Sequence, residues 1–149
     1  MQTFSTDDEF QLIADHGTHV CVAPETEAQM GMGLPATGKL KDLGVPPTLG
    51  VDITSNHSGD MFAQMRLALQ TARMVADIPN ADRNVMPDDV AMTTRDALAW
   101  ATVNGARAAG VDDITGSITP GKQADLVIVD ATAFNLAGWN RRDLLAGVQ

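Results

Sequence analysis

The residues best suited to chemistry follow a short apolar segment in the middle of the chain. Thr48–Val51 is typical of a buried strand, and Asp52 comes directly after it. A carboxylate at the carboxyl end of a strand can bind a metal ion or accept a proton, and its structural alternative is a helix or turn cap. His57, with Asn56, lies in the polar loop that follows. Because imidazole both donates and accepts hydrogen bonds, His57 is a candidate for substrate binding, and a solvated loop histidine is the alternative.

Two acidic residues, Glu25 and Glu27, follow a second apolar segment, Thr18–Ala23. This segment is also predicted to be a buried strand. Acidic groups at the mouth of a site favour a cationic or amine-bearing substrate, and a solvated acidic loop is an equal alternative.

Three other patterns suggest chemistry but are better explained by structure. His16 and His19 flank a helix-ending glycine, so cap and edge roles are favoured over metal binding. Cys21 lies inside an apolar segment and is expected to be a buried thiol. Segment 116–122 has the glycine and lysine spacing of a phosphate-binding loop, but a proline inside it removes a needed N–H group.

Alternating helices and strands must position the candidate residues. The predicted helices run from a cap at Ser5 or Thr6 to Gly17, over Pro35–Leu43, over Met61–Val75, and from Thr93 or Thr94 to about Asn104. Segments 24–34 and 77–89 are predicted loops. After about residue 110 the pattern changes to short strands, Ile114–Ser117 and Leu126–Val129, around a turn at 119–122.

The helix predicted over Met61–Val75 carries an apolar stripe that should face a sheet. The stripe consists of Phe62, Met65, Leu69 and Ala72. Near-continuous apolar character in both predicted strands indicates a parallel sheet that is covered on both faces.

The composition excludes several classes of protein. The chain has 149 residues, 44% hydrophobic and 19% charged, which is typical of a globular protein and not of a disordered one. A net charge of −9 opposes binding to nucleic acid or to an anionic membrane surface. The chain has one cysteine, which cannot form a disulfide within it, and it has no apolar stretch of membrane-spanning length and no signal-peptide pattern. These features predict a cytoplasmic location.

Two ordered motifs resemble the metal-dependent amidohydrolase superfamily. Thr48–Asp52, followed by Ser55–His57 and Asp60–Phe62, resembles the eighth barrel strand of that superfamily and the loop after it. Ala101–Arg107 and Gly116–Asp130 resemble its link from the barrel into a small β-sandwich. The resemblance is greatest to the branch of cytosine deaminases, chlorohydrolases and guanine deaminases, and it covers nearly the whole chain.

The resemblance implies an α/β fold in two partial domains. Residues 1–110 would form strands seven and eight, with their helices, of a (β/α)8 TIM barrel, and residues 111–149 would form part of a β-sandwich. In this family the strand-eight aspartate binds a catalytic zinc or iron ion and takes a proton from the attacking water. That role falls to Asp52.

The implied reaction is hydrolysis of a non-peptide carbon–nitrogen bond, by deamination or dechlorination of a ring-type small molecule with metal-activated water. Substrate binding falls to Glu25, Glu27, Asn56 and His57. The two glutamates stand where the branch commonly carries a Ser-Asn pair, so the resemblance does not extend to a particular substrate.

The family's His-x-His metal pair has no counterpart in this sequence. The chain is therefore expected to be a carboxyl-terminal piece of an amidohydrolase, with the metal bound by the intact parent and not by this chain alone. The alternative is a non-catalytic chain that associates with a complementing amino-terminal half or with itself, because unpaired strand edges recruit other chains.

Overall fold

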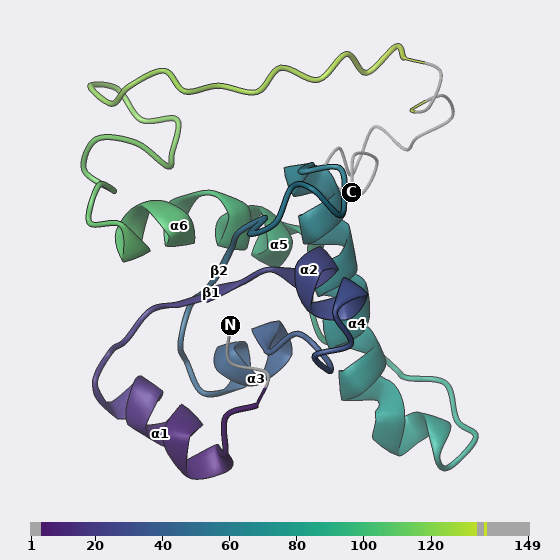
Figure 1. The fold of residues 1–149 in the computed structure, drawn as a ribbon. Coiled ribbons are helices and arrows are strands. Elements are labelled where there is room, and N and C mark those ends of the chain that lie inside the picture. Colours follow the sequence, from purple (N-terminus) through teal and green to yellow (C-terminus); the bar gives the residue numbers. More distant parts are fainter. Residues whose placement is uncertain (1–3, 134–135, 137–149) are drawn as a thin grey trace.

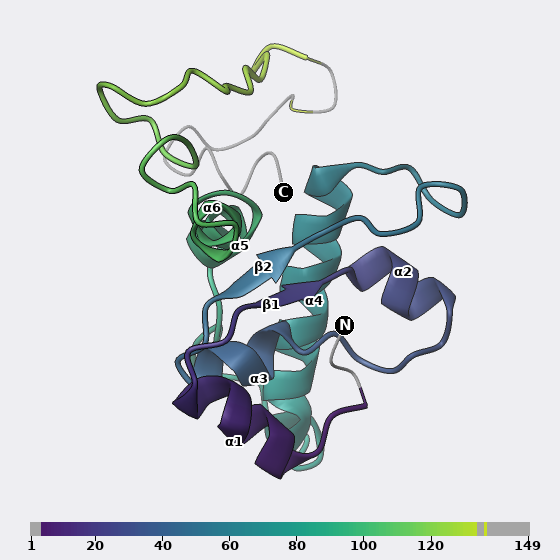
Figure 2. The same cartoon turned by 60° about the vertical axis from the view of Figure 1, so that its left-hand side comes forward.

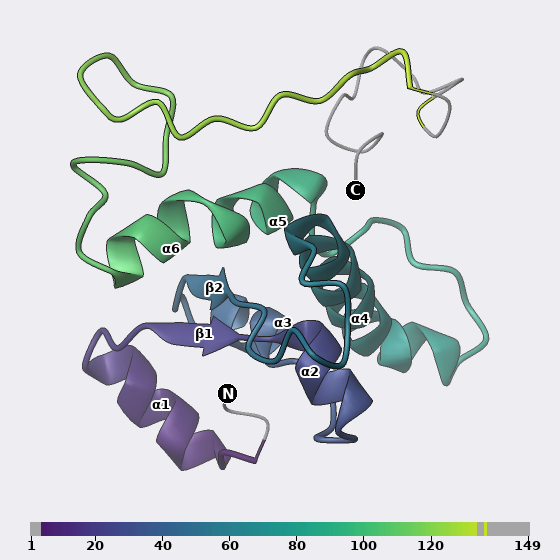
Figure 3. The same cartoon turned by 45° about the horizontal axis from the view of Figure 1, so that its top comes forward.

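The computed structural model describes residues 4–133 and 136. Two short parallel strands, β1 (Val20–Val22) and β2 (Pro47–Leu49), lie at its centre with helices around them (Figure 1). The helices are α1 (Asp7–Asp15), α2 (Pro24–Gln29), α3 (Thr37–Asp42), α4 (Met61–Ala81), α5 (Thr94–Ala101) and α6 (Val103–Ala108). Helix α4 passes behind the strands in Figure 2, and Figure 3 shows α5 and α6 beside β2 with α1 on the β1 side.

Both strands are shorter than predicted. Cys21 pairs with Thr48 in the parallel register, and the Gly50 N–H extends the ladder to the Val22 carbonyl oxygen at 2.9 Å. The expectation that Cys21 is buried is wrong, because this residue is exposed between two buried valines. Alternate side chains of a strand point to opposite faces, so Cys21 lies on the face away from the buried valines. A Cβ atom on Gly50 would come within 2.8 Å of its sulfur.

The predicted starts of α1, α4 and α5 are confirmed, whereas α3 begins at Thr37 and not at Pro35. Thr6 and Thr93 each form a capping box with the acidic residue three positions later, Glu9 and Asp96 respectively. Asp60 caps α4 by accepting a 2.9 Å hydrogen bond from the Phe62 N–H. These side chains satisfy backbone donors that the first turn of each helix leaves without a partner.

Helix α2 corrects the prediction of a loop after Pro24. Proline suits the first position of a helix, because its fixed φ is helical and its missing N–H would have no helical partner there. Two glutamates in the first turn complement the positive end of the helix dipole. This local preference starts a helix directly at the end of β1.

Helix α4 is longer than predicted, so residues 77–81 are helical and not a loop. It continues to Ala81 with Pro79 inside it. Its last turns are held by the Asp82 N–H to Ile78 oxygen bond of 2.9 Å and by the Arg83 Nε to Pro79 oxygen bond of 3.0 Å. Among the described residues no helix, α4 included, is long and apolar enough to cross a membrane.

The single helix predicted to run to about Asn104 is instead two. The backbone leaves the helical region at Thr102, with φ −129° and ψ −95°, and α6 follows. The Asn104 side chain donates a 3.0 Å hydrogen bond to the Pro47 carbonyl oxygen, which fastens α6 to the start of β2. This buried tertiary contact has no signature in helix propensity.

The segment after α6 extends away from the sheet (Figure 1). The turn at 119–122 is present, closed by a 3.1 Å bond from the Lys122 N–H to the Thr119 oxygen. The predicted strands Ile114–Ser117 and Leu126–Val129 are not strands in the described structure. A strand needs a strand beside it with which to pair, and the sheet of the described residues contains only β1 and β2. The Gln123 N–H bonds the Ile114 carbonyl oxygen at 2.8 Å, but no strand forms around this contact. Division into domains at residues 110 and 111 stays a prediction.

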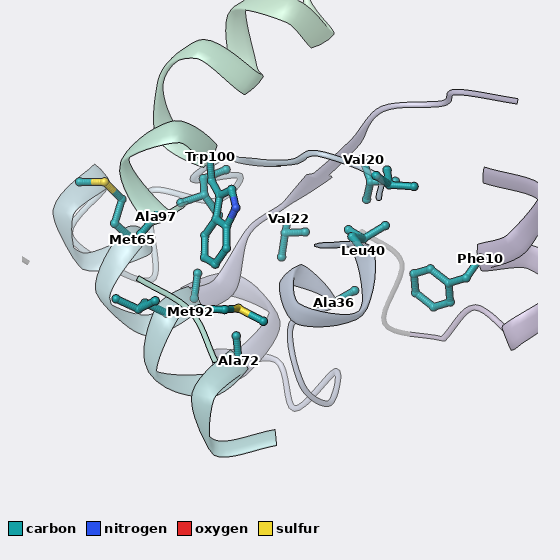
Figure 4. Packing of buried hydrophobic residues seen from close by; sticks show 14 residues of the cluster. Phe10, Val20, Val22, Ala36, Leu40, Met65, Ala72, Met92, Ala97 and Trp100 are labelled. Atoms are coloured by element: carbon teal, nitrogen blue, oxygen red, sulfur yellow. The ribbon is translucent and has the colours of Figure 1, made fainter. Parts of the chain in front are cut away.

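The core lies between the sheet and the helices (Figure 4). Of the predicted α4 stripe, Met65, Leu69 and Ala72 are buried, and Phe62 packs partly buried against the cluster. Trp100 from α5 and Leu40 from α3 complete the packing around β1. The described part of the chain thus has a continuous core that supports the carboxyl ends of both strands.

Substituting Leu40 tests this core. Leu40 is 0% exposed, so Leu40→Ala leaves a cavity and is expected to lower the free energy of unfolding by about 2–5 kcal/mol. Leu12 on α1 is 56% exposed, and Leu12→Ala is the matched control with an expected change within about 0.5 kcal/mol. Urea denaturation of both variants measures the difference, and equal losses would contradict this description of the core.

Candidate active site

The candidate residues come together because β1 and β2 are parallel. Both strands end at the same edge of the sheet, where β1 leads into α2 and β2 leads into the loop 50–60 (Figure 2). Glu25 and Glu27 lie on α2, and Asp52 and His57 lie on the loop. Two segments that are distant in sequence therefore form one polar cluster.

Asp52 is exposed and has a left-handed backbone with φ +64°. Aspartate tolerates this region better than most residues, yet a non-glycine residue there costs on the order of 1–3 kcal/mol and requires support from its surroundings.

That support comes from Thr26, which is 0% exposed. Its hydroxyl donates a 2.9 Å hydrogen bond to the Val51 carbonyl oxygen and accepts a longer one, 3.5 Å, from the Ile53 N–H. These two backbone groups flank Asp52. Thr26 Oγ1 also lies 2.8 Å from His57 Nε2.

His57 is held between Thr26 and Glu25, and its side chain is only 7% exposed. The hydroxyl proton of Thr26 is used by Val51, so His57 Nε2 is the donor in their contact. On the other side of the ring, Nδ1 lies 3.3 Å from Glu25 Oε2 and 3.4 Å from the Gly59 nitrogen. Nδ1 can donate to the carboxylate when the ring is charged and accept from Gly59 when it is neutral.

Gln64 of α4 fixes Glu25 at both ends. Its amide nitrogen donates a 2.6 Å hydrogen bond to Glu25 Oε2, and its amide oxygen accepts a 3.1 Å bond from the Glu25 N–H. Gln64 is 0% exposed. A chain of polar contacts, part-exposed only at Glu25, therefore runs from α4 through α2 and His57 to the backbone around Asp52.

Glu27 is 0% exposed and only half satisfied. Its Oε1 accepts a 3.1 Å hydrogen bond from the Ala23 N–H, whereas Oε2 has no hydrogen-bond partner among the described residues. Burial raises the pKa of the Glu27 carboxyl above its usual value, the Ala23 N–H opposes this shift, and the charge of Asp52 adds to it.

The Glu27→Gln variant tests this effect. Because the pKa of Glu27 is raised on folding, its ionised form destabilises the folded state, and stability is lost as the pH rises above the ordinary value of 4.5. Glutamine keeps the shape and removes the charge. The variant is expected to be more stable than the parent near pH 8, with a difference that shrinks as the pH falls toward 4.5. Urea denaturation across this range measures it, and a difference independent of pH would contradict the raised pKa.

Asn56 is exposed in the loop 50–60, and this chain of polar contacts does not include it. The described residues contain no group of three or more His, Cys, Asp or Glu side chains placed to hold a metal ion. Asp52 fits the requirement for one carboxylate ligand, whereas a complete catalytic metal centre usually needs about three protein ligands. The described residues therefore do not form a complete centre by themselves.

Thr26 and Gln64 are the site residues that the sequence does not reveal. Thr26 stands between two glutamates in a segment predicted to be a loop. Gln64 is a polar residue on a helix that was predicted to bury its apolar stripe. The sequence gives one indication that Gln64 is buried. It directly precedes Met65 of that stripe and therefore lies close to the core.

A model of the amidohydrolase family matches residues 2–145. The chain belongs to this family. Over 135 residues it is 35% identical to a 5-methylthioadenosine/S-adenosylhomocysteine deaminase of Teredinibacter turnerae, a match that covers 90% of this chain and 28% of the relative. An 8-oxoguanine deaminase of Pseudomonas aeruginosa is 33% identical over 132 residues, which cover 88% of this chain and 27% of that protein.

Solved structures agree with this membership. An adenosine deaminase from Xanthomonas campestris with bound zinc has a TM-score of 0.82 and 32% identity, and the match covers 99% of this chain and 31% of that one. A guanine deaminase from Bradyrhizobium japonicum shares the fold with a TM-score of 0.68 at 21% identity, over 83% of this chain and 28% of that one. These similarities confirm that the chain has a fold of the family's barrel type. The chain spans less than a third of the length of these relatives.

Proposed function

We propose that this amidohydrolase-family chain contributes one side of the active site of a metal-dependent enzyme that hydrolyses a non-peptide carbon–nitrogen bond. The observation that carries the proposal is the position of Asp52 at the carboxyl end of β2, in a cluster with residues from the end of β1. We favour deamination of a ring-type small molecule over dechlorination, since the relatives described above carry the names of purine-type deaminases.

Asp52 is the residue proposed to bind the metal and to take the proton of the attacking water. When bound, a divalent zinc or iron ion would supply a water of lowered pKa. Glu27 is proposed to bind an amino or ring N–H group of the substrate through Oε2, an acceptor atom without a partner among the described residues. Because Oε2 is buried in this structure, the substrate could reach it only once the site opens. Glu25 Oε2 lies 3.3 Å from His57 Nδ1, so these two proposed substrate-binding residues are in contact. Asn56 offers an exposed amide in the loop 50–60.

A chimeric enzyme tests the role of Asp52. In the Teredinibacter turnerae relative, the matched segment is replaced by this chain, and ammonia release from 5-methylthioadenosine is measured with zinc. Asp52→Asn is expected to lower kcat by about 10²–10⁴-fold, because the carboxylate is the proposed proton acceptor. Asp88→Asn, an exposed carboxylate of the loop after α4, is the control and should leave kcat unchanged. Equal activity of both variants, or a folded zinc-containing chimera without deaminase activity, would contradict the proposal.

The purified chain alone is expected to release no ammonia from these substrates and to hold no stoichiometric zinc. The reason is the donor set, since Asp52 can supply only one of about three ligands. Elemental analysis after dialysis measures the zinc content, with the Asp52→Asn variant as the control. Tightly bound zinc at one ion per chain, lost in Asp52→Asn, would contradict this expectation.

A second candidate function is association without catalysis, either with a complementing amino-terminal half or with another copy. It is favoured by the extended segment Leu126–Val129, whose Ile128 is 92% exposed, and by two strands that each have a single neighbour among the described residues. Sedimentation velocity with limited proteolysis decides this point. A protease-resistant monomer would remove the reason for this candidate.

The net charge and the single cysteine support two further proposals. A charge of −9 is unfavourable for nucleic-acid or anionic-membrane partners, which leaves a small molecule as the proposed ligand. The exposed free thiol of Cys21 suits a reducing compartment, and we propose the cytoplasm.

A further inference from the structure

The backbone at Asp52 is the least favourable part of the candidate site. Its φ of +64° places a side chain in a region that is natural for glycine, and the residue is exposed, so core packing does not hold it there. A carboxylate that must meet a metal or a proton donor needs a fixed direction. Some other group has to restrict this residue.

One hydroxyl group contacts the backbone on both sides of Asp52. Thr26 Oγ1 donates to the Val51 oxygen at 2.9 Å and accepts from the Ile53 nitrogen at 3.5 Å. These atoms belong to the two peptide groups whose relative rotation is defined by φ and ψ of Asp52. A single atom bound to both peptide groups restricts both angles together.

The hydroxyl itself is oriented by a second layer of contacts. His57 Nε2 approaches it at 2.8 Å, Glu25 Oε2 lies 3.3 Å from the other ring nitrogen, and Gln64 binds Glu25 through two hydrogen bonds. Thr26, Gln64 and the His57 side chain are buried, and Glu25 between them is 23% exposed, so water reaches this chain of contacts only at Glu25. The direction of the Thr26 O–H bond is therefore set by side chains from α2, the loop 50–60 and α4.

We propose that Thr26 is a positioning residue whose hydroxyl, oriented by His57 and Glu25, clamps the two peptide groups around Asp52. The clamp holds the Asp52 backbone in the left-handed conformation and so sets the direction in which its carboxylate leaves the chain. The importance of that carboxylate rests on the proposed function. The clamp itself is a property of the chain without metal or substrate, so it can be tested separately.

Nuclear magnetic resonance of the full chain tests the clamp through Thr26→Val, which keeps the shape and removes the hydroxyl. A left-handed residue gives a strong intraresidue NOE between its amide proton and Hα. The parent must show this NOE at Asp52 and slowed amide exchange at Ile53, and absence of either overturns the proposal. In Thr26→Val we expect the NOE to weaken and Ile53 exchange to accelerate about fivefold to tenfold, the factor expected for one lost hydrogen bond.

Two variants separate positioning from general destabilisation. Thr26→Ser restores the hydroxyl and should retain both signals. Thr48→Val is the matched control, because Thr48 is also buried and its hydroxyl donates to a backbone oxygen, that of Val20, away from Asp52. This control should keep both signals. An unchanged NOE and unchanged exchange in folded Thr26→Val overturn the proposal, as does equal loss in Thr48→Val. Thr26→Ala takes the place of Thr26→Val if the valine variant does not fold.

The chimeric enzyme gives a second readout. Thr26→Val is expected to lower kcat by about 10–100-fold with little change in KM, as for residues that orient a metal ligand, and Thr26→Ser should recover most of it. A chimera that is inactive in every form counts against the proposed function and leaves the magnetic resonance result valid. An active chimera whose kcat is insensitive to Thr26→Val overturns the positioning role.

Discussion

Parallel pairing of β1 with β2 is the constraint on which the candidate site depends. In a parallel pair both chains leave the sheet at the same edge, so the residues after Val22 and those after Leu49 enter the same space. A slip of one residue would turn each side chain to the opposite face. The backbone on either side of Asp52 would then no longer meet the hydroxyl of Thr26. Two strands of only three residues each therefore fix the geometry of the whole polar cluster.

The immediate start of α2 after β1 is the second requirement. Successive helical residues point about 100° apart, so the three residues after Pro24 have three different surroundings. Glu25 meets His57 and Gln64, Thr26 meets the backbone of the loop 50–60, and Glu27 turns back to the Ala23 N–H. An extended or irregular segment of the same sequence would not separate them in this way.

Much of the local structure could be predicted from the sequence because its causes are local. Thr6, Asp60 and Thr93 cap helices as expected, since a cap requires only a side-chain oxygen and the next few N–H groups. The position of Asp52 after a strand was also predictable, and the motifs around it correctly indicated the family.

Features that depend on distant contacts could not be read in the same way. The break at Thr102 accompanies a hydrogen bond between Asn104 and Pro47, which are 57 residues apart. Glu25 and Gln64 are 39 residues apart, and neither residue type indicates the other. The apolar run Leu126–Val129 has the composition of a strand, but composition does not provide the neighbour that a strand requires.

The buried carboxyl of Glu27 shows what such a cluster requires of the rest of the molecule. A neutral polar side chain of similar size, which still accepts from the Ala23 N–H, would remove the cost of burying a charged carboxyl, and selection for stability alone would favour that replacement. The core around Leu40 and Trp100 must supply the stability that this position gives up. Substitutions that raise the melting temperature are therefore expected at Glu27. Such a substitution would replace Oε2, the acceptor atom proposed for the substrate.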